Sequence, residues 1–245
     1  MRTNYRVNSG VRFELLSRDQ LQELFEGVLH VLEYTGLDVQ HEEARDILKK
    51  AGAWVEGERV RIPSYIVRDA LNKAPRSFTL WARDGNPKHN IHIGPGRAHF
   101  GPGPTCVNFI DPDTMERRPY VKSDVPTVAR IVDALDNIDF CESLGTVGDV
   151  HHDLGALYEF AGMFPNTSKP IVAWSYDWHD SAGIHQIAVA EAGGQLAFEK
   201  RPNYVHYCEP LSPLVSTFEA LDKLIFAAKH RVPLVFTPCP LAGGT

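Results

Sequence analysis

The sequence predicts an α/β protein: a partial TIM-type (β/α) barrel of about four βα units, preceded by an N-terminal helical and β-hairpin region. Three observations predict this class. Apolar strand candidates begin near Phe140, Pro170, Pro202 and Val232, at intervals of about 30 residues. Helical patterns alternate with them, which indicates a parallel sheet. Polar and aromatic side chains follow every strand, and barrel enzymes build their active sites at this end of the strands.

The first region, residues 1–122, opens with helices. Ser17 and Gln20 stand at capping-box spacing before a run of apolar residues at helical period, and Gly36 ends the run. A second helix should end at Gly52, and a short third helix should lie near Ile66–Leu71.

Short strand-like runs follow, separated by Gly, Pro, Asn and Asp as in hairpins. They are Ser77–Trp81, Asn90–Ile93, Ala98–Phe100 and Cys106–Ile110. The acidic residues Asp111, Asp113 and Glu116 are interpreted as a hairpin tip, because the spacing of a calcium-binding loop is absent.

The second region, residues 123–245, is the predicted first half of a (β/α)8 barrel. Helices should open after Ser123 and Asp153, run over Ile184–Glu191, and start again at Ser216, with Glu219 at capping-box spacing. An open doubly wound sheet is the alternative. The first βα turn lacks the third glycine of a dinucleotide-binding loop, which favours the barrel.

The fourth strand candidate is followed only by a short segment ending at Thr245. A half-barrel would leave unpaired hydrophobic strand edges, which promote aggregation. We therefore expect the sequence to be the N-terminal half of a longer protein. An inactive truncated fragment is the alternative.

Composition excludes several classes. The formal net charge of −6 and the lack of a Lys/Arg run give no reason to expect a nucleic-acid or membrane partner. No signal-peptide or transmembrane stretch is evident, so we expect a cytoplasmic protein. The four cysteines form no CxxC pair, which argues against a disulfide scaffold or a zinc finger.

Side chains at the predicted strand ends form the candidate substrate site. Aromatic rings bind quaternary ammonium groups through their quadrupole, and carboxylates in a dry pocket add charge complementarity. We expect the substrate to be bound by Asp149, His151, Trp174, Tyr176, Tyr207 and Glu209. The alternative is that the aromatic residues only pack the fold. The catalytic residues remain unassigned.

Several segments resemble the trimethylamine methyltransferase family, and together they cover nearly the whole chain. They are Tyr34–Val39, Arg61–Pro63, Phe109–Pro119, Ser123–Val125, Asp149–Val150, Thr167–Pro170, Leu211–Leu214 and Pro238–Gly243. The resemblance implies a barrel that transfers a methyl group from a methylated amine, such as trimethylamine or glycine betaine, to a corrinoid protein. It also implies a role in processes such as methanogenesis, a homo-oligomer at full length, and no directly bound cofactor or metal.

One enzyme alternative remains from the residues themselves. A zinc-dependent barrel methyltransferase acting on thiols would use Cys208, Cys239 and one histidine as ligands.

Overall fold

The computed structural model describes residues 14–243. The N-terminal stretch that we examined for a signal peptide lies mostly outside these residues. Every helix within them is too short or too polar to cross a membrane.

Helix α1 (Arg18–His30) begins where the sequence predicts. The Ser17 hydroxyl accepts a hydrogen bond from the backbone N–H of Gln20 at 3.2 Å, and the Gln20 side chain accepts one from the backbone N–H of Ser17 at 2.9 Å. This reciprocal pair satisfies donors that the first turn would otherwise leave free. The helix continues as a π-helical turn, Val31–Thr35, and stops at Gly36, whose φ of 75° favours glycine.

A small four-stranded sheet lies next to α1. β1 (Leu37–Val39) pairs antiparallel with β3 (Arg59–Arg61), which pairs with β2 (Trp54–Glu56). β10 (Val215–Ser216) adds parallel to the free edge of β1, so the order is β10-β1-β3-β2. A segment from the second region therefore completes the N-terminal sheet. The two further helices of this region are α2 (Glu42–Lys50) and α3 (Ser64–Lys73).

Two antiparallel hairpins follow along the chain. β4 (Phe78–Leu80) pairs with β5 (Ile91–Ile93), and β6 (Asn108–Ile110) pairs with β7 (Arg117–Pro119). The strand predicted over Ala98–Phe100 is wrong, because this segment is a loop. Prolines flank it on both sides, and a proline has no N–H to donate to a strand ladder.

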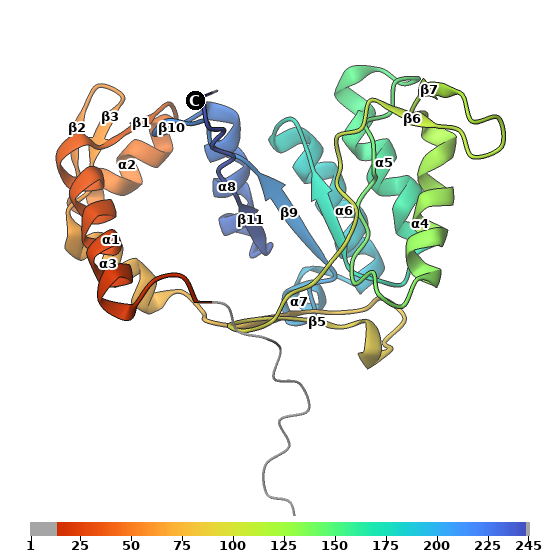
Figure 1. Cartoon of the computed structure of the whole chain (residues 1–245), viewed down its shortest axis with the longest axis horizontal. Helices are drawn as coiled ribbons and strands as arrows, with labels where there is room; N and C mark the ends of the chain where they lie inside the picture. Colours follow the sequence, from red (N-terminus) through yellow and green to blue (C-terminus); the bar gives the residue numbers. More distant parts are fainter. Residues whose placement is uncertain (1–13, 244–245) are drawn as a thin grey trace, which may run out of the picture.

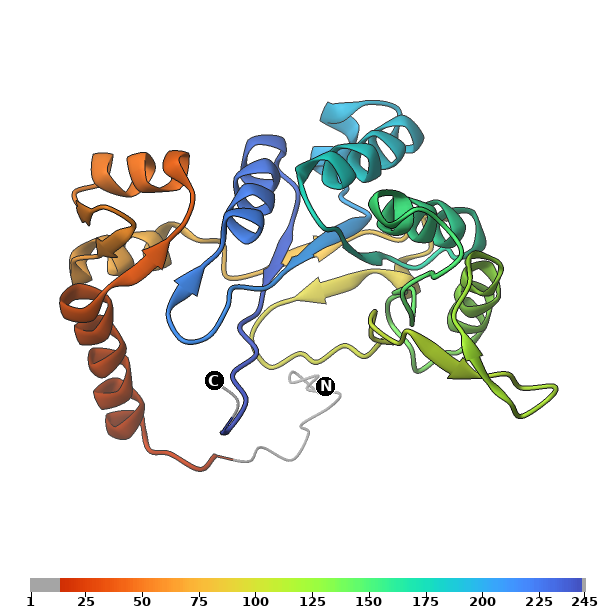
Figure 2. The same ribbon diagram turned by 90° about the horizontal axis from the view of Figure 1, so that it is seen from above.

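A parallel sheet forms the centre of the second region. β8 (Ile171–Trp174), β9 (Tyr204–Cys208) and β11 (Leu234–Phe236) lie in the order β11-β9-β8, so neighbours in the chain are neighbours in the sheet. Figure 2 shows the helices of this region along one side of these strands. They are α4 (Val125–Ala134), α5 (Gly155–Met163), α6 (Trp178–Ala192), α7 (Gln195–Lys200) and α8 (Phe218–His230).

The strand expected to begin near Phe140 is only partly formed. Cys141 makes an isolated parallel bridge to Ile171 of β8, and Gly145 makes a second bridge to the segment before β6. Between them Leu144 has a φ of 69°, which turns the backbone and prevents a continuous ladder. The segment nevertheless extends the parallel order by one position beyond β8.

The predicted capping box of the last helix is also shifted. α8 is capped by Thr217, whose hydroxyl accepts a hydrogen bond from the backbone N–H of Ala220 at 3.3 Å. Ser216 instead belongs to β10, where its backbone pairs with β1.

Buried side chains gather in separate clusters. The largest lies between the parallel sheet and its helices, and includes Phe160 of α5 and Ile184 of α6. A second lies under β1 and β3 and takes Leu221 from α8. A third joins the β4–β5 hairpin to the opposite face of the parallel sheet through contacts around Val205. Figure 1 shows this hairpin running below the strands. Residues 14–243 thus form a mixed α/β fold of several small sheets, with no closed barrel among them.

Candidate functional site

Two aromatic side chains stand next to each other at the carboxyl end of the parallel sheet. Successive side chains on a strand point to opposite faces. Val172 and Val205 contact the hairpin cluster on what we call the inner face, the face turned away from the helices. Trp174 and Tyr207 are each two residues further on and lie on the same face, and they are paired in the β8–β9 register. Both side chains are partly buried.

Glu142 approaches the same face from the neighbouring segment. Phe140 packs into the inner-face cluster and Cys141 into the helix-side cluster, so the alternation places Glu142 on the inner face. Only 6% of Glu142 is exposed. Burial raises the pKa of its carboxyl group to about 8, and the nearby charge of Glu159 acts in the same direction. The Glu142 carboxylate in turn contributes to raising the pKa of Tyr207, after burial, Glu209 and Cys239.

Glu159 of α5 holds the indole of Trp174. Its Oε2 accepts a hydrogen bond from Trp174 Nε1 at 2.6 Å, and its Oε1 accepts one from the backbone N–H of Val147 at 3.0 Å. The residue is only 1% exposed. Burial raises the pKa of this carboxyl group, while hydrogen bonds from Val147, Ser143 and Trp174 oppose the shift. Glu159 therefore links Val147, in the loop that follows Cys141, to the side chain of Trp174.

Tyr176 forms the rim beside Trp174. The two rings meet edge to face, with centroids 4.7 Å apart, and the ring of His152 stacks on Tyr176 with centroids 4.1 Å apart. The carboxylate of Asp180, which is buried, accepts a hydrogen bond from the backbone N–H of Tyr176 at 3.1 Å. Burial raises the pKa of Asp180, and this hydrogen bond opposes the shift.

The structure brings together some of the residues that the sequence singled out. Trp174 and Tyr176 are in contact, Tyr207 is paired with Trp174, and the Tyr207 hydroxyl donates a hydrogen bond to Glu209. Two others have different partners. Asp149 accepts a hydrogen bond from the backbone N–H of Lys122 at 2.7 Å, and the exposed His151 lies 3.6 Å from Asp153.

The sequence analysis did not identify the buried carboxylates. It selected His151 and not its neighbour His152. Glu142, Glu159 and Asp180 were not among the predicted site residues, and the ring that reaches Tyr176 belongs to His152. A weak signal did exist, since Glu159 interrupts an apolar helical stretch next to Phe160.

The cysteines of the zinc alternative lie in unrelated surroundings. Cys208 is buried, and its thiol donates to the backbone oxygen of Ala220 at 3.4 Å. Burial raises its pKa to about 11, which disfavours the thiolate that binds zinc. Cys239 is exposed. Over residues 14–243, no group of three His, Cys, Asp or Glu side chains is arranged to hold a metal ion.

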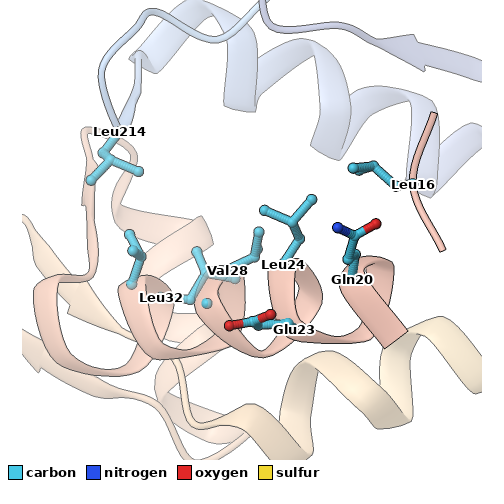
Figure 3. A pocket seen from close by; sticks show the side chains of 9 residues that line it. Leu16, Gln20, Glu23, Leu24, Val28, Leu32 and Leu214 are labelled. Atoms are coloured by element: carbon cyan, nitrogen blue, oxygen red, sulfur yellow. The ribbon is translucent and has the colours of Figure 1, made fainter. Parts of the chain in front are cut away.

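A separate cavity of about 750 Å³ lies along α1 (Figure 3). Leu24, Val28 and Leu32 of the helix and its π-helical extension line it, and Leu214 lies across from them. Ligand sites usually combine an apolar lining with a few convergent polar groups. Here the side chains of Gln20 and Glu23 are the polar lining, so this cavity offers little to orient a ligand.

The fold and the site together define an α/β protein with an aromatic and acidic site at the ends of parallel strands, a setting suited to a small cationic ligand. The chain belongs to the trimethylamine methyltransferase family, whose family model matches residues 2–245.

Individual relatives agree with this assignment. A trimethylamine methyltransferase of Desulfitobacterium hafniense (strain DSM 10664 / DCB-2) is 32% identical over 94% of this chain and 46% of its own length. The corresponding protein of Methanosarcina thermophila is 30% identical over 97% of the chain and 50% of its length. A glycine betaine methyltransferase of D. hafniense (strain Y51) is 26% identical over 96% of the chain and 48% of its length. The chain thus spans about half the length of the curated relatives it matches.

Proposed function

We propose that this chain provides the amine-binding wall of a methyltransferase that removes a methyl group from trimethylamine or from a quaternary amine such as glycine betaine. One observation carries the proposal: Trp174 and Tyr207 are paired on the inner face, and the buried Glu142 lies near enough for its charge to act on Tyr207. Aromatic rings attract a methylated ammonium group by about 0.5–2 kcal/mol per contact. An opposite charge about 4 Å away adds roughly 4 kcal/mol where the effective dielectric constant is about 20.

The chemistry follows from binding a cationic methyl donor in a partly desolvated place. When a nucleophile takes the methyl group from a quaternary ammonium, the amine leaves as a neutral molecule, so the positive charge disappears from the site. The residues named here would orient the donor and limit access of water. Glu159 supports this role because its hydrogen bond fixes the plane of the Trp174 ring.

The methyl acceptor that we propose is a corrinoid carried by a partner protein, which would supply the nucleophile. An acceptor that arrives from outside would reach the aromatic residues at the carboxyl ends of the parallel strands, the end at which barrel enzymes place their active sites. Figure 2 shows the strands covered by helices on one side only. Residues 14–243 supply the donor side of this arrangement in our proposal.

The wider architecture is part of the same proposal. Consecutive parallel strands with helices along one side are the pattern of a (β/α)8 barrel, so we propose that these units form its first half, with the N-terminal region ending near residue 122. We also retain the proposals of a cytoplasmic protein and of a homo-oligomer at full length.

Thermal unfolding of the purified chain with and without trimethylamine or glycine betaine tests the proposal. A ligand at ten times its dissociation constant adds about 1.4 kcal/mol to the native state, or roughly 3–6 °C for a chain of this size. The response should disappear in Trp174→Leu and persist in the control Trp54→Leu, because Trp54 is an exposed residue of β2. No shift with either amine, or an undiminished shift in Trp174→Leu, would overturn the proposal.

A further inference from the structure

We propose that Glu142 is the charge partner of the bound ammonium group and that it releases its proton when the cation binds. This inference rests on the proposed function of the site and adds to it the way in which the site accommodates a positive charge. Its starting point is the unequal surroundings of the two buried carboxyl groups, Glu142 and Glu159.

Glu159 has hydrogen-bond donors at its carboxyl group, and they oppose the rise in its pKa that burial causes. Both of its oxygens accept hydrogen bonds, from Val147 and from Trp174 Nε1. Such donors stabilise the charged form of a carboxyl group. Its Oε2 is already used to hold the indole, so Glu159 positions the aromatic wall and is not free to pair with a ligand.

Glu142 has the opposite surroundings. It is more than nine-tenths buried, and within residues 14–243 no donor is paired with its carboxyl group. A buried charge without a partner is strongly unfavourable, and the charge of Glu159 adds repulsion. The empty site therefore keeps Glu142 protonated. An ammonium group placed against Trp174 and Tyr207 would supply the missing opposite charge.

The other titratable groups around Glu142 do not replace such a partner. Glu159 acts on it from α5, while Glu142 itself acts on Tyr207 of β9 and on Cys141, its neighbour in its own segment. Burial raises the pKa of the Tyr207 phenol and raises that of the Cys141 thiol to about 12, so both stay neutral near pH 7. Among the described residues, no lysine or arginine acts on Glu142.

The exchange is balanced in charge. The O–H bond of the Glu142 carboxyl group breaks, its proton passes to the buffer, and the quaternary ammonium cation takes its place beside the carboxylate. Below the pH at which the empty site would lose this proton, the affinity for a quaternary ammonium ion should rise about tenfold per pH unit. A neutral molecule of the same shape should bind without releasing a proton.

Isothermal titration calorimetry at pH 7 provides the test, with choline as the probe and its neutral isostere 3,3-dimethylbutan-1-ol as the control ligand. Titrations in two buffers with different ionisation heats give the number of protons released. We expect close to one proton per choline and none for the isostere. Glu142→Gln should bind choline at least tenfold more weakly and release no proton, whereas Glu58→Gln, in the turn between β2 and β3, should behave as the unchanged protein.

The outcomes separate the two proposals. Choline binding without proton release, or with release that persists in Glu142→Gln, overturns the role of Glu142 and leaves the amine site standing. If the folded chain binds neither trimethylamine, glycine betaine nor choline, the proposed function itself fails. The pH dependence of choline affinity in the unchanged protein gives the same answer without any variant.

Discussion

Replacing Glu142 with glutamine should change how the stability of the protein depends on pH. An unfolded glutamate ionises near pH 4.5, whereas folded Glu142 keeps its proton up to about pH 8. Between these values the folded state binds more protons than the unfolded state, so this group's contribution falls as pH rises. The contribution is fully present below about pH 4.5 and lost above about pH 8. The loss corresponds to at most about 5 kcal/mol.

Glutamine has nearly the same shape and cannot ionise, so the variant should lack this loss. We expect the free energy of unfolding of Glu142→Gln, measured with urea, to lie within about 1 kcal/mol of the unchanged protein at pH 5 and to exceed it by about 2–5 kcal/mol at pH 9. Taking the difference between the two proteins removes the contributions of other titrating groups. A difference that stays constant from pH 5 to pH 9 would refute the assignment of a buried, protonated Glu142.

Three further predictions concern the supports of the site. A double-mutant cycle of Glu159→Gln and Trp174→Phe should give a coupling of about 1–3 kcal/mol, because the pair shares a buried hydrogen bond of 2.6 Å; a coupling under about 0.5 kcal/mol would contradict this. Gly145→Ala should destabilise the protein by about 1–3 kcal/mol in urea unfolding, since a Cβ there would lie 2.3 Å from a backbone oxygen. Gly27→Ala, in open space on α1, should instead stabilise the protein by up to about 1 kcal/mol. If both alanine variants changed the free energy of unfolding in the same direction, the packing argument would be wrong. EDTA should leave thermal unfolding and choline binding unchanged; a loss reversed by zinc would favour the thiol methyltransferase alternative.

Local signals in the sequence identified the regular elements well. The capping box at Ser17 and the apolar period of the following residues set the start of α1, and the repeat of strand and helix patterns anticipated α4, α5, α6 and α8. These signals involve residues a few positions apart, so a sequence displays them directly.

The small N-terminal sheet could not be found in this way. Its strands have two or three residues each, and β3 places a valine between two arginines, which reads equally well as a loop. The pairing of Asp38 with Val215 joins segments from opposite ends of the chain. Such pairing depends on the packing of α8 against the N-terminal region and leaves no local pattern.

The sequence predicted the aromatic residues of the site but not its buried carboxylates. Trp174, Tyr176 and Tyr207 follow strands, and the parallel order brings strand ends together, so their proximity could be predicted. Glu142 and Glu159 are charged residues that a sequence reader assigns to the surface. Their burial depends on how the segment around Glu142 and helix α5 pack in the folded chain, where Glu159 accepts hydrogen bonds from Val147 and Trp174.

The most direct test of the account is whether a methylated cation binds against Trp174. In a protein with Trp54, Trp81 and Trp178 changed to phenylalanine, Trp174 is the one remaining tryptophan of the sequence, and excitation at about 295 nm selects it over the tyrosines. We predict a saturable change in its emission on addition of tetramethylammonium, weakened at least tenfold by Glu142→Gln. A folded protein whose Trp174 emission does not respond would contradict the cation site, and an equal response with and without Glu142 would contradict the role of Glu142 alone.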